Sequence, residues 1–117
     1  MNKLNIVFVV NDVGPLFKAL ADPTRRHVVQ LLSEGPRRAG EIADSAGVSG
    51  PAMSRHLRVL LQAGIVADER PADDARVRLF RLRPGSIAAV QAWLDQLQAH
   101  WDVQLRSFKR HVEGSRL

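Results

Sequence analysis

Residues Glu41–Gly64 read EIADSAGVSGPAMSRHLRVLLQAG, and this stretch decides the predicted fold. Its pattern is a short helix, a break at Gly47-Val48-Ser49, and a second helix that ends at Ala63-Gly64. Two helices joined by so tight a turn need a small residue at their contact and a glycine in the turn, which Ala43 and Gly47 supply. The second helix also carries one apolar stripe, formed by Met53, Leu57, Leu60 and Leu61. The stretch therefore predicts a helix-turn-helix.

The outer face of the second helix differs in character from its apolar stripe. Ser49 is expected to cap this helix, with Pro51 in its first turn. A helix-turn-helix presents the start of its second helix to the major groove of DNA, where helix-terminal N–H groups lie near phosphate. The residues opposite the stripe are Pro51, Arg55, Arg58, Val59 and Gln62. The two arginines among them favour a polyanionic partner.

Regular elements are also predicted on both sides of the helix-turn-helix. Upstream, a short helix from Pro15 precedes another that starts at Asp22-Pro23 and is ended by Gly35-Pro36. Downstream, two strand-like runs, Ile65–Glu69 and Val77–Leu82, predict a hairpin with a polar tip. We therefore expect a mainly α-helical fold with a small β-hairpin wing, which is a winged helix-turn-helix.

A long final helix is predicted from a cap at Ser86 to about Val112. Its apolar residues recur every three or four positions over about seven turns, a seam too long for a small domain to cover alone. Such a helix usually packs against its copy in a second subunit, so we expect a homodimer. The seam residues are Ile87, Val90, Leu94, Leu97, Trp101, Leu105, Phe108 and Val112.

Length and composition fit one globular domain of 117 residues. We expect a leader at 1–14, either an edge strand or disordered, a winged helix-turn-helix DNA-binding and dimerisation domain at 15–113, and a tail at 114–117. Basic residues outnumber acidic ones by 17 to 12, for a net charge of +5, and fourteen of the seventeen are arginine. The absence of cysteine excludes disulfides and thiolate metal sites.

No membrane partner is expected. The longest purely apolar run, Ile6–Val10, is far shorter than the ~18–20 residues of a membrane span. The amino terminus also lacks the pattern of a signal peptide. A cytoplasmic protein is therefore expected.

Three segments carry a resemblance to a known family: LFKALADPTRRHVVQLLSEG (16–35), EIADSAGVSGPAMSRHLRVLLQAGIV (41–66) and RLFRLRP (78–84). They resemble the ArsR/SmtB family of bacterial winged helix-turn-helix repressors. The resemblance implies a homodimer on an imperfect inverted-repeat operator, which represses transcription, often of its own operon, until a signal lowers DNA affinity. The dimer residues it implies on the first and last helices are Leu16, Phe17, Leu20, Val90, Leu94, Leu97, Trp101, Leu105 and Phe108.

The resemblance also implies which residues of the recognition helix, Gly50–Ala63, contact DNA. Base edges are expected near Ser54 and Arg55, and phosphate near Arg58. For His56, at the flank of the buried stripe, partial packing is favoured over a phosphate contact. Many family members have Gln at the position of Gly50, so one adenine reader is absent here. The candidate DNA-binding residues of this helix are Ser49, Pro51, Ser54, Arg55, His56 and Arg58.

Arginines outside the recognition helix have two interpretations each. Arg76 and Arg78 either clamp the flanking DNA backbone or minor groove, or belong to a solvated hairpin partly neutralised by Asp73-Asp74. The clamp is favoured because a helix-turn-helix lies beside them. Arg25-Arg26 open a helix that either touches phosphate or presents an exposed ion-pairing face, and the sequence leaves both open.

No metal site is expected. The candidate ligands on the last helix are His100, Asp102, His111 and Glu113. His100 and His111 are eleven residues apart, about three turns, so they share a face without reaching one metal ion within a chain. A metal-sensing repressor with a cross-dimer site at these two histidines is the alternative hypothesis. The closer resemblance is to metal-independent family members.

Other function classes fit the sequence less well. Ser54 and His56, two apart on a helix, cannot form a nucleophile–base pair, and no cofactor fingerprint is present, so neither catalysis nor a cofactor is expected. Val59 would suit a winged helix that contacts only proteins, but the two arginines of the outer face oppose this alternative. Trp93 and Trp101, near one helix face, raise a further hypothesis of a pocket for an unknown small-molecule effector.

Overall fold

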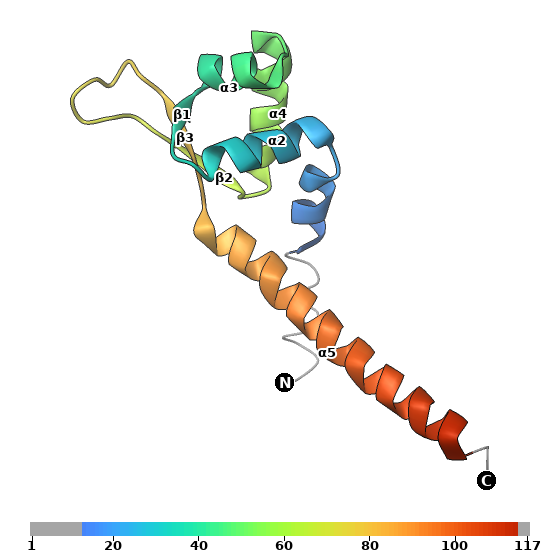
Figure 1. Cartoon of the computed structure of the whole chain (residues 1–117). Coiled ribbons are helices and arrows are strands. Elements are labelled where there is room, and N and C mark those ends of the chain that lie inside the picture. Colours follow the sequence, from blue (N-terminus) through green and yellow to red (C-terminus); the bar gives the residue numbers. More distant parts are fainter. Residues whose placement is uncertain (1–12, 115–117) are drawn as a thin grey trace.

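The computed structural model describes residues 13–114 as a small head from which one long helix extends (Figure 1). An N-terminal helix at 13–20 opens the head. The elements that follow are α2 (Pro23–Leu32), β1 (Arg37–Arg38), α3 (Ala39–Ala46), α4 (Gly50–Gln62), β2 (Val66–Glu69), β3 (Leu79–Leu82) and α5 (Pro84–Gly114). This order confirms the predicted winged helix-turn-helix, in which α3 and α4 are the two helices and β2 and β3 form the wing.

Most of the expected leader at 1–14 lies outside the described residues. Its last two residues, Val13 and Gly14, belong to the N-terminal helix, and Val13 is buried. The helix therefore includes Pro15 in its first described turn, a position where proline is tolerated because its missing N–H would have no partner. At the other end, α5 continues to Gly114, the first residue of the expected tail.

Side-chain caps set where two of the helices begin. The Asp22 carboxylate accepts hydrogen bonds from the backbone N–H groups of Thr24 (2.8 Å) and Arg25 (3.1 Å), which confirms it as the cap of α2. Ser49 likewise caps α4, its hydroxyl oxygen accepting from Ala52 N–H at 3.2 Å. The expected cap at Ser86 is wrong: α5 begins earlier, at Pro84, and the Ser86 hydroxyl donates to the Arg83 carbonyl.

The wing belongs to a three-stranded antiparallel sheet with strand order β1-β3-β2. β2 pairs with β3 as the hairpin predicts, with Asp68 opposite Phe80, although both strands are shorter than their strand-like runs. The third strand, Arg37–Arg38, was not expected from the sequence. Two successive arginines carry no strand pattern, and only pairing with β3 makes them a strand.

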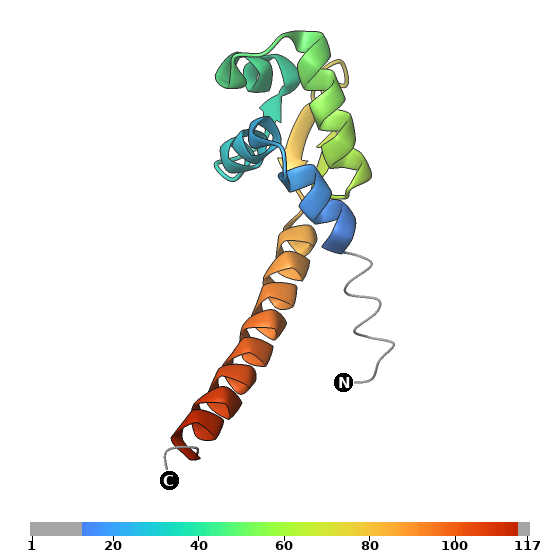
Figure 2. The same cartoon turned by 90° about the vertical axis from the view of Figure 1, so that its right-hand side faces the viewer.

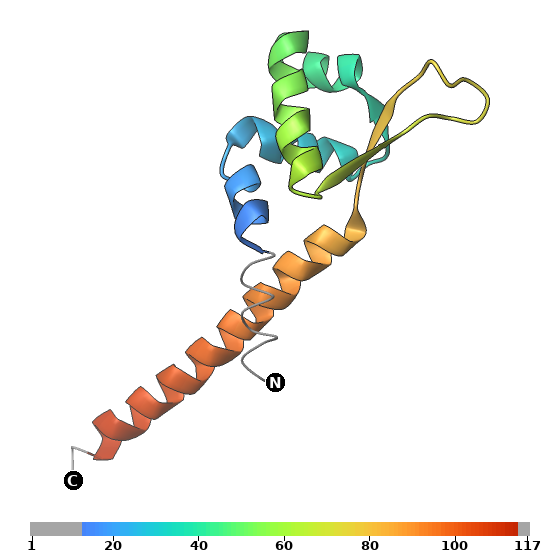
Figure 3. The same cartoon turned by 180° about the vertical axis from the view of Figure 1, so that it is seen from behind.

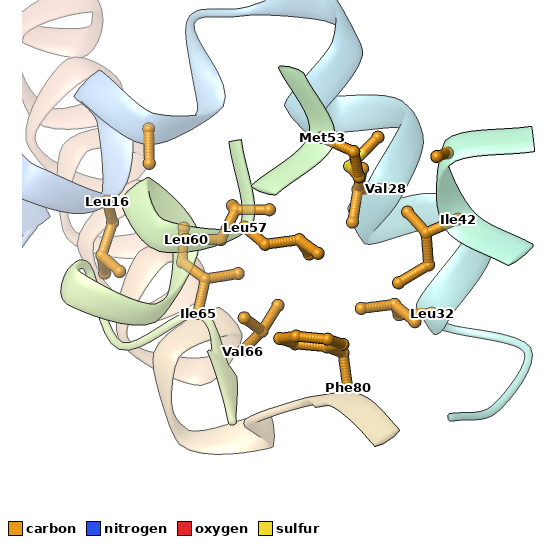
Figure 4. Packing of buried hydrophobic residues seen from close by; sticks show 12 residues of the cluster. Leu16, Val28, Leu32, Ile42, Met53, Leu57, Leu60, Ile65, Val66 and Phe80 are labelled. Atoms are coloured by element: carbon orange, nitrogen blue, oxygen red, sulfur yellow. The ribbon is translucent and has the colours of Figure 1, made fainter. Parts of the chain in front are cut away.

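The core lies between α4, the sheet and the other helices of the head (Figure 4). The stripe of α4 is confirmed, since Met53, Leu57 and Leu60 are buried and Leu61 is half-buried. Val59, expected on the outer face, instead packs partly against the core. α4 contacts α2, α3 and β2, so its neighbours cover a wider face than a single stripe requires. The other large buried side chains of the core are Leu16, Val28, Leu32, Ile42, Ile65, Val66 and Phe80.

α5 leaves the head along a path on which nothing else in the described chain covers it (Figures 1 and 2). Its 31 residues span about 46 Å, and none of them is buried. Only its first turns meet the head: Ala89 and Val90 pack against the core, and Trp93 meets the Phe17 ring edge-on with 5.1 Å between ring centroids. Among residues 13–114, no helix has the length and apolar character needed to cross a bilayer.

Gly47, in the turn between α3 and α4, and Gly40, within α3, provide a pair of glycine substitutions with opposite expected effects on stability. Gly47 has φ +68°, where L side chains are strained, whereas Gly40 in α3 has open space around an added Cβ. Gly47→Ala is expected to lower the free energy of unfolding by roughly 1 kcal/mol or more, and Gly40→Ala to raise it by about 0.4–1 kcal/mol. Urea unfolding of both variants measures the two shifts, and equal shifts of the same sign would contradict this account of the turn.

Candidate nucleic-acid interface

α4 begins at the end of the head that is remote from α5 and runs back toward the base of the head (Figure 3). Because Met53, Leu57 and Leu60 are buried in the core, Ser54, Arg55 and Arg58 lie on the exposed side of the helix. Arg55 and Arg58 form no hydrogen bond or ion pair with another described residue, so both guanidinium groups are available to a partner. The exposed residues at the start and on the outer side of this helix are Ser49, Gly50, Pro51, Ser54, Arg55, Arg58 and Gln62.

A groove of about 320 Å³ separates the recognition helix from the sheet. Its polar groups come from α4 and from the segment that leads into β3, while its remaining lining is apolar. It therefore brings together three of the candidate DNA-binding residues. The groove is lined by Ala39, Ser54, Leu57, Arg58, Leu61, Arg78 and Phe80.

Arg78 is held in place at the edge of this groove. Its Nε donates to the Asp68 carboxylate at 2.8 Å, and its guanidinium carbon lies 4.7 Å from the centroid of the Phe80 ring. The hydrogen bond from Arg78 lowers the pKa of Asp68 below its ordinary value. The acid that partners Arg78 is therefore on the facing strand β2, and not among the two aspartates at the tip.

The tip of the wing is braced by its own arginines. Arg76 Nε and its backbone N–H both donate to the Asp74 carboxylate at 3.1 Å, and these bonds lower the pKa of Asp74. The Arg76 side chain nevertheless remains 93% exposed, and an ion pair at such a site is weak. Arg70 Nη1 reaches across the loop and donates to the Ala75 carbonyl at 2.9 Å. Arg76 thus combines elements of both interpretations, since it is paired and still exposed.

Arg25 and Arg26 form no ion pair among residues 13–114, and their side chains donate mainly to backbone carbonyls. Arg26 Nη1 donates to the carbonyls of Leu20 and Ala21, both at 2.9 Å. Arg25 Nε donates to the Ala19 carbonyl at 2.6 Å, and its Nη1 lies 3.3 Å from Nδ1 of His56. His56 is half-buried, in agreement with the packing favoured for it. These contacts had no signal in the sequence, because they cross from α2 to the preceding helix and to α4.

The candidate dimer residues divide into a core group and an exposed group. Leu16 is only 4% exposed and belongs to the core of the head, so almost no surface of it is left for a partner. Leu20 and Val90 are half-buried against that core. The exposed members are Phe17, Leu94, Leu97, Trp101, Leu105 and Phe108.

The other candidate groups lie apart from one another. The described part of the chain holds no cluster of three or more His, Asp or Glu residues that could bind a metal ion, and His100 and His111 are both exposed on α5. Trp93 packs on Phe17, whereas Trp101 is 54% exposed, so the two indoles have different surroundings.

Comparison with known proteins agrees with this architecture. Residues 22–68, from the cap of α2 into β2, match the family described as "Bacterial regulatory protein, arsR family". The chain is 46% identical over 98 residues to the HTH-type transcriptional regulator Rv2034 of Mycobacterium tuberculosis, a match that covers 84% of this chain and 86% of that protein. The chain belongs to the ArsR family.

Solved structures show the same fold. The crystal structure of the transcriptional repressor BigR from Xylella fastidiosa is 30% identical, with a TM-score of 0.60 over 79% of this chain and 92% of that one. A homodimeric winged helix-turn-helix domain, Mb0332 from Mycobacterium bovis, superimposes with a TM-score of 0.62 at 24% identity, over 88% of this chain and 91% of that one. This ArsR-family chain is a DNA-binding transcriptional regulator and not an enzyme.

Two of the ion pairs of the wing, Arg78–Asp68 and Arg76–Asp74, predict a reciprocal pattern of carboxyl pKa values. In Arg78→Ala the pKa of Asp68 is expected to rise toward its ordinary value while that of Asp74 stays low, and in Arg76→Ala the reverse is expected. Because both pKa values are lowered in the folded state, the ionised forms stabilise the wing above about pH 4, and this contribution is lost as the pH falls through the lowered values. Carboxyl NMR titration measures both groups, and an unchanged Asp68 in Arg78→Ala would rule out this pairing.

Proposed function

We propose that the protein is a dimeric repressor that binds an imperfect inverted-repeat operator in the cytoplasm. Each α4 enters the major groove of one half-site, and each wing lies along the flanking backbone. The observation that carries this proposal is the outer face of α4, where Arg55 and Arg58 are exposed and have no acidic partner among the described residues. Two unpaired guanidinium groups on this face suit the phosphates and base edges of DNA.

The candidate contacts follow from where the side chains lie. Ser54 and Arg55 come from the early turns of α4 and are assigned to base edges, with Ser49 and Pro51 at the helix start against the backbone. Arg58 and Arg78 meet at one groove, so they are assigned to phosphate of the same strand. Arg76, at the exposed tip of the wing, is assigned to the flanking backbone or minor groove.

The exposed apolar side of α5 supports the dimer. Phe108 is 68% exposed and Trp101 54% exposed in a single chain, and both continue the line of Leu94 and Leu97. A soluble chain rarely leaves such a stripe in water, and a second copy of α5 would cover it. The homodimeric state of the Mb0332 domain, which has the same fold, is consistent with this arrangement.

Repression is inferred from the resemblance and from relatives such as BigR, which is named a repressor. We further propose that the chain represses its own operon and that no metal acts as its signal. The absence of a three-ligand cluster among residues 13–114 supports the second point within one protomer. A cross-dimer site at His100 and His111 is the competing hypothesis, so the test below includes Zn²⁺.

The direct test measures binding to the promoter upstream of the gene by fluorescence anisotropy across a salt series, with random duplex as competitor. We expect operator binding that is ~10³-fold or more tighter than random binding and falls steeply with salt. Addition of Zn²⁺ or a chelator is expected to leave the affinity unchanged. Loss of binding with Zn²⁺ would favour the metal-sensing alternative, and equal affinity for random DNA would favour the protein-interaction alternative.

In the same assay, Arg55→Ala is expected to weaken operator binding by ~1–3 kcal/mol and to relax specificity, because it removes a base contact. Arg58→Ala is expected to weaken operator and random binding alike and to reduce the salt slope by about one. Arg106→Ala on α5 removes the same charge far from α4 and controls for net charge. Equal losses of operator and random binding in Arg55→Ala would reassign Arg55 to phosphate.

Leu97→Glu is expected to make the protein monomeric, because it places a charge in the apolar line of α5. Ala99→Glu provides the matched control: it is also exposed on α5, but two residues further along, on the opposite side of the helix. Sedimentation velocity distinguishes the two states. A Leu97→Glu variant that still sediments as a dimer would overturn the assigned interface.

A further inference from the structure

One guanidinium group joins two helices that are separate in the sequence. Arg25, in the first turn of α2, donates from Nε to the Ala19 carbonyl at 2.6 Å and from Nη2 to the Lys18 carbonyl at 3.5 Å. Its Nη1 lies 3.3 Å from Nδ1 of His56 on α4. The side chain therefore caps the N-terminal helix and contacts the recognition helix at the same time.

The donor and the acceptor of the Arg25–His56 hydrogen bond can be assigned from the groups themselves. A guanidinium group carries donors and no acceptor, so the Arg25 N–H must donate and His56 Nδ1 must accept. Lysine cannot replace the arginine, because a single ammonium on a flexible stem does not present a planar fork to three acceptors.

The neighbouring Arg26 makes the same kind of hydrogen bond to the N-terminal helix as Arg25, but has no bond to His56. Its Nη1 donates to the carbonyls of Leu20 and Ala21, both at 2.9 Å, and it forms no hydrogen bond or ion pair with α4. Both arginines thus satisfy carbonyls at the end of the N-terminal helix, and only Arg25 continues to His56. The chain therefore contains its own matched control.

The other side of the N-terminal helix leads to α5. Phe17 packs edge-on against Trp93 with 5.1 Å between ring centroids, and Leu16 and Ala19 are buried in the core of the head. A continuous line of contacts therefore runs from Trp93 through the N-terminal helix and Arg25 to His56. It connects the helix proposed to form the dimer with the helix proposed to read DNA.

We propose that Arg25 is a positioning residue that, through His56, sets the orientation of α4 relative to α5. In a dimer this orientation determines the distance between the two recognition helices, and hence the spacing of half-sites that the protein accepts. His56 then acts as the receiving end of this link and not as a phosphate contact. The inference rests on the proposed dimeric, operator-binding function.

The test compares binding of Arg25→Ala and Arg26→Ala to the operator and to versions whose half-sites are moved by one base pair in each direction. Arg25→Ala is expected to reduce the preference for the native spacing by about 2- to 30-fold. Its salt slope is expected to stay at the wild-type value, since no phosphate contact is lost, and Arg26→Ala is expected to keep the spacing preference. A salt slope reduced by about one in Arg25→Ala would make it a phosphate contact and overturn the inference.

Variants of His56 separate the link from the capping role of Arg25. His56→Gln leaves the Arg25 bonds to Ala19 and Lys18 in place and is expected to lose the spacing preference. His56→Asn offers an amide oxygen near the position of Nδ1 and is expected to restore most of it. The double variant Arg25→Ala/His56→Gln is expected to be no worse than either single variant, and losses that multiply would show two independent contacts and overturn the link.

The outcomes distinguish this inference from the function on which it rests. A wild-type protein without preference for the operator over random DNA would overturn the proposed function. A wild-type protein that prefers the operator, together with an Arg25→Ala variant of unchanged spacing preference, would overturn the positioning role alone. Urea unfolding of each variant checks that the head is folded in every comparison.

Discussion

The packing of one face of α4 into the core is the constraint on which the rest of the head depends. Met53, Leu57 and Leu60 meet Ile42 and Phe80 across the interior, so α4 cannot rotate about its axis without exposing apolar surface. This packing also determines which residues of α4 face outward, because side chains on one helix face recur every three or four residues and the others lie on the opposite face. The proposed DNA-reading face is therefore a consequence of the core, and the tight turn at Gly47 sets how α4 meets α3.

Arginine has two separate uses in this chain. Arg55 and Arg58 have no partner among the described residues and are free for phosphate or bases. Arg25 and Arg26 bond within the fold to backbone carbonyls and an imidazole, while Arg78 contacts an aspartate and an aromatic face and still lines the groove beside Arg58. A planar group with five donors in a rigid fork can donate to several acceptors and stack on an aromatic face, a geometry that an ammonium group does not have. Arginine therefore serves both the internal packing of the head and the outer face of α4.

The head buries its apolar side chains within one chain, whereas α5 does not. The described part of the head leaves no buried side-chain polar atom without a partner and encloses a continuous apolar core. α5 has no buried residue and carries a line of exposed apolar side chains. In the dimer that we propose, each head has its own complete core, and the two chains are joined by the apolar sides of their α5 helices. The Phe17–Trp93 contact is one of the places where the head and α5 meet. Through this contact, the position of the N-terminal helix depends on that of α5.

The sequence by itself determined the local features of this protein. The caps at Asp22 and Ser49, the buried stripe and outward arginines of α4, the hairpin and the apolar line of α5 were all predictable, because each depends on neighbours within a few residues. Only the tertiary structure decided that Arg37–Arg38 is a strand, that Leu16 is core, that Asp68 holds Arg78 and that Arg25 reaches His56. These contacts join residues as distant in the sequence as Arg37 and Phe80, and no local pattern in a single sequence records which distant segments will meet.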